Sequence, residues 1–136
     1  MEFLDTNVLV YAASGLPADR QKTQIARALA SRTDIAISLQ VLQEFYVQAT
    51  RESRPDPLTH KQAVGLVESF LRFPVQETTS GVMLADLAAR QRFLISYWDA
   101  ALIEAARALG CDVVISEDLS DGEDYNGVRV DDPFRS

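Results

Sequence analysis

The chain has 136 residues, of which 47% are hydrophobic and 24% charged, so its composition excludes a disordered protein and predicts one compact core. No apolar run reaches the roughly 18 residues of a membrane span, and the opening MEFLDTNVLVYAA lacks a secretion signal, so we expect a cytoplasmic protein. The net charge of -7 argues against simple electrostatic adhesion to nucleic acid, although it leaves nucleic acid open as a substrate of an acidic metal site.

Short strands alternate with longer helices in the first half of the chain. The opening EFLDT run predicts a strand that ends at Asp5, and apolar residues at helical spacing predict a helix over residues 18–31. A second strand over residues 35–38 is followed by a helix over residues 39–51, which carries Glu44 near its middle. This alternation is typical of α/β proteins.

The second half continues the pattern after two prolines in the segment RPDPL. Ser96 begins an S-x-x-D helix start that places Asp99 in the first turn of a helix ending at Leu109, with Gly110 after it. The remaining predicted elements are helices over residues 59–72 and 80–92, and strands over residues 74–76, 113–116 and 128–130. The continuous apolar strand before Asp118 is typical of a parallel sheet covered on both faces. We therefore expect one domain over residues 1–136, a three-layer α/β/α sandwich around a central, mostly parallel sheet.

Four carboxylates are predicted to meet at one edge of this sheet. Asp5 ends the first strand, Glu44 lies on the helix after the second, Asp99 begins the helix before the fourth, and Asp118 lies just past that strand. In open α/β sheets, sites form beyond the carboxyl ends of the strands. Clustered carboxylates repel one another unless cations neutralise them, and an oxygen-only ligand set suits Mg²⁺ or Mn²⁺. The sequence therefore predicts a metal site.

Each acidic residue also has an ordinary explanation. Asp99 could serve only to stabilise a helix start, and Asp118 belongs to the acidic segment SEDLSDGED, which is typical of a solvated loop. Glu117 and Asp121 are alternatives to Asp118 at the last position of the set. The ordered combination of the four, and not any one of them, carries the metal-site hypothesis.

Other catalytic chemistries find little support. Cys111 is the only cysteine and His60 the only histidine, so a multi-thiolate zinc site is excluded and we expect no histidine-based triad. We expect Cys111 to be a buried structural thiol and His60 an exposed residue at a helix start. Lys22 and Lys61 both fall in predicted helices, which disfavours a phosphoacceptor receiver domain, a fold that places a lysine after a strand.

Substrate contacts would come from cationic and aromatic side chains. Arg51 lies seven residues after Glu44, two turns along the same predicted helix, and is the first candidate for a phosphate contact, with Arg54 as the second. We expect the aromatic residues to pack in the core or in a dimer interface, with stacking on bases as the alternative; they are Tyr11, Tyr97 and Trp98.

The chain resembles the PIN-domain nucleases, particularly their small toxin-like members of the VapC type. The resemblance covers nearly the whole chain, through FLDTNVLVYA, WDAALIEAA, ISEDLSDG and GVRVDDPF. It implies a metal-dependent ribonuclease whose acidic pocket corresponds to the four carboxylates above, with polar support from Thr6, Asn7 and Ser116. It also implies an RNA substrate, an antitoxin partner that covers the site, and a homodimer. The competing hypothesis is a catalytically inactive PIN-like module that binds RNA or protein.

Overall fold

A computed structural model describes residues 1–135 and contains a central sheet in which every strand pairing is parallel. The strand order across the sheet is β3-β2-β1-β4-β5. The strands are β1 (Glu2–Leu4), β2 (Ile35–Ser38), β3 (Val75–Gln76), β4 (Val113–Ile115) and β5 (Arg129–Asp131). Because β1 lies in the middle and the chain winds outward in both directions, the sheet is doubly wound, as predicted.

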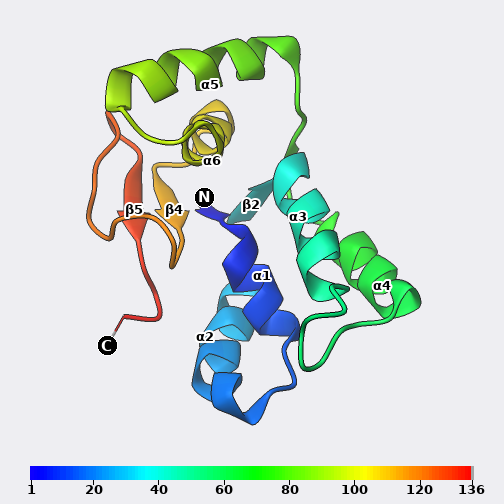
Figure 1. The fold of residues 1–136 in the computed structure, drawn as a ribbon. Coiled ribbons are helices and arrows are strands. Elements are labelled where there is room, and N and C mark those ends of the chain that lie inside the picture. The colour runs from blue at the N-terminus through cyan, green and yellow to red at the C-terminus, as the bar shows by residue number, and fades with distance from the viewer. Residues whose placement is uncertain (136) are drawn as a thin grey trace.

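Helices cover both faces of the sheet (Figure 1). Right-handed crossovers toward β3 place the first four α-helices on one face, and the crossover back to β4 places the last two on the other. The helices are α1 (Thr6–Ala13), η1 (Pro17–Asp19), α2 (Arg20–Ala30), α3 (Leu39–Ala49), α4 (His60–Phe70), α5 (Ser80–Phe93) and α6 (Tyr97–Ala108). The predicted three-layer α/β/α sandwich is confirmed.

The sheet is apolar in its interior and polar at its carboxyl edge. Phe3, Leu4 and Ile115 have almost no solvent exposure, and the register pairs Leu4 with Ile115 across β1 and β4. The residues that follow these strands are Asp5 and Ser116, and both are buried although both are polar. The register therefore sets two polar side chains next to each other at the edge where ligands bind in this class of fold.

Two helices differ from the sequence-based expectation. Helix α1 was not predicted, and it begins directly after the first strand, with Asp5 as its N-cap. Helix α5 was predicted correctly in extent, but it buries an acidic residue, Asp86, beside Ala89, and charged residues are almost never buried unless they are paired. In the part of the chain that the structure describes, no helix is long and apolar enough to cross a membrane.

Candidate active site

Asp5 lies at the centre of a polar cluster at the carboxyl edge of the sheet. Its extended backbone ends β1 and begins α1, and its Oδ1 accepts a hydrogen bond of 2.6 Å from the Thr6 backbone N–H. Its backbone N–H donates to the carbonyl oxygen of Ile115, which continues the pairing of β1 with β4 by one residue. Only 4% of Asp5 is exposed, so its position is set by both the strand and the helix cap.

Ser116 connects Asp5 to the loop after β4. The buried Ser116 hydroxyl donates to Asp5 Oδ2 at 2.7 Å and accepts from the backbone N–H of Asp118 at 3.1 Å. Asn7 strengthens the connection, because its Nδ2 donates to Asp118 Oδ2 at 3.1 Å and to Asp5 Oδ2 at 3.4 Å. Asp5 and Asp118, which are 113 positions apart in the sequence, are thus bridged by one amide group.

Glu44 joins the cluster from α3. The Thr6 hydroxyl donates to Glu44 Oε2 at 3.0 Å, and Gln40 Nε2 donates to Glu44 Oε1 at the same distance. Sequence reasoning missed Gln40, although its position one helical turn before Glu44 places the two side chains on one face of the helix. Both carboxylate oxygens of Glu44 are therefore oriented by neutral donors.

The electrostatics of the cluster favour a bound cation. Burial raises the pKa of Asp5 to about 6; the hydrogen bonds from Ser116 and Thr6 oppose the rise, and the nearby charges of Asp118 and Glu44 add to it. A buried carboxylate with two like-charged neighbours holds its charge at a cost that a cation would offset. The carboxylates of the cluster offer oxygen ligands, which suit Mg²⁺ or Mn²⁺.

Asp99 is less closely connected to the cluster. It lies in the first turn of α6, as predicted, where its backbone N–H donates to the Ser96 cap, and its side chain makes no hydrogen bond to Asp5, Glu44 or Asp118 within residues 1–135. In the same described range, no three carboxylate, histidine or cysteine side chains are close enough together to hold one ion. The side chains that separate the carboxylates are the neutral donors Thr6 and Asn7. The carboxylate oxygens of these residues suit a hard cation, but within the described range they do not form a complete ligand shell around one.

The two alternatives to Asp118 are engaged elsewhere. Glu117 forms an ion pair with Lys22 and accepts a hydrogen bond from the Tyr11 hydroxyl. Burial alone would raise the pKa of Glu117, but these two partners hold it below its ordinary value. Asp121 accepts from the Asp132 backbone N–H, 2.9 Å away, on the β5 side. Asp118 is the acidic residue of this loop that contacts the cluster.

The two candidate arginines differ in their surroundings. Arg51 is exposed just after the end of α3 and lines an open groove of about 400 Å³ together with Glu44. Arg54 is half-buried and paired with Asp56, which also accepts a hydrogen bond from the Gly15 backbone N–H. Of the two, Arg51 is free to meet a phosphate beside the cluster.

The fold and the site define a class: a doubly wound α/β domain with acidic side chains at the carboxyl edge of its central strands. The PIN-domain family model matches residues 3–120, and the chain belongs to this family. Among curated proteins, none matches the sequence closely enough to count as a relative.

Similar solved structures support the fold. A toxin–antitoxin complex from Klebsiella pneumoniae aligns with a TM-score of 0.69 and 20% identity over 100% of both chains. DNA-bound VapBC from Salmonella typhimurium aligns at 0.64 and 21% identity over 97% of both chains. The sarcin-ricin loop cleaving toxin VapC20 of Mycobacterium tuberculosis aligns at 0.60 and 16% identity over 84% of this chain and 87% of that one. At identities of 16–21%, these TM-scores show that the chains share a fold, and nothing beyond the fold.

Proposed function

We propose that this protein is a metal-dependent endoribonuclease and the toxin of a toxin–antitoxin pair that acts in the cytoplasm. The observation that carries the proposal is the cluster of Asp5, Glu44 and Asp118, held together by Thr6, Asn7 and Ser116 at the carboxyl edge of the sheet. Membership of the PIN-domain family supports a nuclease. The names of the similar structures, a VapC toxin and toxin–antitoxin complexes, support an RNA substrate and an antitoxin.

The four carboxylates Asp5, Glu44, Asp99 and Asp118 would hold Mg²⁺ or Mn²⁺, which supplies positive charge to the reacting phosphate and lowers the pKa of the attacking water. The chain's own residues position the reactants. Thr6 and Gln40 orient Glu44, and Asn7 and Ser116 orient Asp118 and Asp5. Arg51 contacts a neighbouring phosphate and offsets the repulsion between RNA and an acidic surface.

The deciding experiment is cleavage of a mixed RNA pool with and without Mg²⁺ or Mn²⁺, followed by mapping of the ends. Asp5→Asn and Asp99→Asn are expected to abolish cleavage and to leave the fold intact. Asp112→Asn is the matched control, because Asp112 is exposed at the opposite, amino end of β4. Unchanged cleavage by both variants would refute the assignment. Metal-independent RNA binding without cleavage would favour the inactive binding module.

Two exposed apolar surfaces are suited to binding protein partners. Helices α3 and α4 enclose an open groove of about 480 Å³, lined by apolar side chains such as Val47 and Leu71, which are 57% and 53% exposed. An apolar segment of the antitoxin would fill this groove. Helix α5 carries a second patch with the exposed residues Met83, Leu84 and Leu87, which we assign to the homodimer interface.

A further inference from the structure

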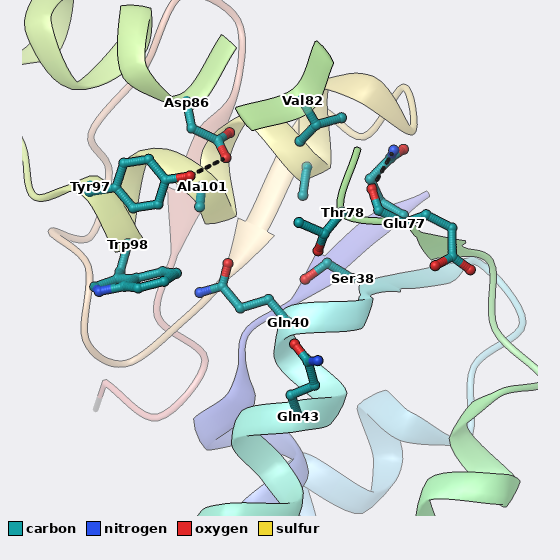
Figure 2. A pocket seen from close by; sticks show the side chains of 12 residues that line it. Ser38, Gln40, Gln43, Glu77, Thr78, Val82, Asp86, Tyr97, Trp98 and Ala101 are labelled. Atoms are coloured by element: carbon teal, nitrogen blue, oxygen red, sulfur yellow. Dashed lines mark hydrogen bonds between the residues drawn. The ribbon is translucent and has the colours of Figure 1, made fainter. Parts of the chain in front are cut away.

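A second cavity opens at the same edge of the sheet, between α3, the segment after β3, and helices α5 and α6 (Figure 2). Its volume is about 180 Å³, well above the roughly 10–15 Å³ that a single water requires. The side chains that matter for the argument are Asp86, Tyr97 and Trp98 on one side and Gln40 and Gln43 on the other. The cavity can therefore accept a planar ring that polar groups contact at its edge.

The cavity adjoins the candidate active site. Gln40 lines it and also donates to Glu44. Gln43 lines both this cavity and the groove that contains Glu44 and Arg51. A strand of RNA with a phosphate at the acidic cluster would thus have a neighbouring base within reach of the cavity.

Asp86 carries the one buried side-chain oxygen among residues 1–135 that has no hydrogen-bond partner. It is only 4% exposed, and its Oδ1 has no hydrogen-bond partner within residues 1–135. Its Oδ2 accepts one long hydrogen bond of 3.3 Å from the Tyr97 hydroxyl, as Figure 2 shows. Burial raises the pKa of this carboxyl to about 6, against the hydrogen bond from Tyr97, and the charge of Glu104 adds to the rise. Oδ1 itself has almost no accessible surface, so a ligand that supplies the missing donors meets both oxygens once the carboxylate turns toward the cavity that Asp86 lines.

Trp98 supplies an aromatic surface at the same cavity. Trp98 is 61% exposed, so of the two packings expected for it, in the core or in a dimer interface, the structure contradicts the core. Tyr97 meets it edge-on at 5.0 Å between ring centroids. An exposed indole beside a polar cavity is a suitable platform for stacking a base of single-stranded RNA.

We propose that this cavity is a guanine-specific base subsite, in which Trp98 stacks on the base and Asp86 accepts from its edge. The proposal rests on the proposed ribonuclease function for its substrate. Guanine presents two adjacent donors, N1–H and the 2-amino group, that match the two oxygens of a carboxylate. Adenine and cytosine present a single amino donor beside an acceptor on the same edge, and uracil presents one N–H between two carbonyls, so none of them can satisfy both oxygens of Asp86.

Trp98 is the only tryptophan of the chain, so its fluorescence reports occupancy of the subsite without any cleavage. We would titrate metal-free protein with guanosine, inosine and adenosine 5′-monophosphates, which share a phosphate and lose the two edge donors in turn. Guanosine monophosphate is expected to quench the fluorescence and to bind about tenfold more tightly than adenosine monophosphate, with inosine monophosphate in between. Equal affinities for all three, or no quenching, would overturn the proposal.

Variants separate recognition of the base from a structural role of the side chain. Asp86→Asn is expected to weaken binding of guanosine monophosphate about tenfold and to remove the preference over adenosine monophosphate, whereas the control Asp112→Asn keeps both. If Asp86→Asn lowers the melting temperature, a second variant tests the same carboxylate. Tyr97→Phe removes the one hydrogen bond that the protein donates to Asp86, and it must still bind guanosine monophosphate in preference to adenosine monophosphate. A preference that survives in Asp86→Asn refutes the assignment.

Cleavage assays distinguish failure of this proposal from failure of the proposed function. On RNA, Trp98→Ala is expected to raise KM about tenfold with little change in kcat, and Trp98→Phe to restore it. Selective guanosine monophosphate binding without RNA cleavage would support the subsite and contradict the nuclease. Cleavage that ignores guanine and is unchanged in Asp86→Asn would support the nuclease and contradict the subsite.

Discussion

Replacing Asp5 by asparagine is expected to stabilise the metal-free protein while it removes activity. The pKa of the Asp5 carboxyl rises from 3.8 to about 6 in the folded chain, chiefly through burial. Each pKa unit corresponds to about 1.36 kcal/mol, so ionised Asp5 costs up to about 3 kcal/mol of the free energy of unfolding at neutral pH. Asparagine lacks the charge, and its side-chain oxygen can still accept from the Thr6 N–H or the Ser116 hydroxyl. For a chain of this length, the gain corresponds to a rise in melting temperature of up to about 10 °C.

The sign of the pH dependence follows from proton binding. Between about pH 4 and pH 6 the folded protein holds a proton on Asp5 that the unfolded chain has lost, so wild-type stability falls as the pH rises through this window. Asp5→Asn does not lose stability in this way. Its free energy of unfolding should therefore be close to that of wild type at pH 4 and should exceed it by the full amount above about pH 7. Urea denaturation in the presence of a chelator, from pH 4 to pH 7.5, measures the difference, with Asp112→Asn as control.

Added cation reverses the comparison. Mg²⁺ or Mn²⁺ should raise the melting temperature of the wild type by mass action and have a smaller effect on Asp5→Asn, which has lost a ligand charge. A variant that is less stable than wild type at every pH, or an advantage that does not change with pH, would refute the argument that Asp5 bears an uncompensated buried charge.

Three further predictions concern the surroundings of the cluster. Ser116→Ala should destabilise the protein by about 1–3 kcal/mol in denaturant titrations, because it leaves two loop N–H groups without their acceptor and leaves Asp5 Oδ2 only the longer hydrogen bond from Asn7. An unchanged midpoint would contradict this. Arg51→Ala should weaken RNA binding and reduce the slope of log affinity against log salt concentration by about one. Arg54→Ala should change this slope less, because the Arg54 side chain is paired with Asp56. Equal slopes for the two variants would refute the distinction. Leu84→Glu should convert a dimer into a folded monomer in sizing experiments, because Leu84 is 63% exposed and its replacement leaves the core packing unchanged, and a persistent dimer would place the interface elsewhere.

The helix that the sequence analysis missed shows where periodicity fails. Helix α1 has the sequence TNVLVYAA, in which apolar residues occupy nearly every position and no polar face interrupts them. Such a run, with two β-branched valines, cannot be distinguished from a buried strand by its pattern alone. The informative signal was Asp5, since aspartate before a threonine and an asparagine is a typical helix N-cap. The same signal was read correctly at Ser96, where the sequence was more amphipathic.

Helix α5 shows the opposite limit. Its extent was predicted correctly, but hydrophobicity does not single out its buried side, because Ala89 is buried on one side while Met83, Leu84 and Leu87 form the exposed patch on another. The side chain that does enter the interior is Asp86, which any hydrophobicity argument assigns to solvent. A buried aspartate on an otherwise ordinary helix therefore became visible only from the packing of α5 on α6.

The carboxylates of the cluster were predictable, whereas the hydrogen bonds that connect them were not, and the register of the sheet explains the difference. Acidic residues at strand ends can be assigned to an edge from the order of the elements alone. The contact of Ser116 with Asp5 depends in addition on the pairing of Leu4 with Ile115, since the next residue on each strand then lies beside its partner. A slip of one residue would turn Ser116 to the other face of the sheet and remove its hydrogen bond. The connections made by Thr6 and Asn7 likewise depend on helix α1, which begins at Asp5 and directs both side chains toward acidic residues of other elements.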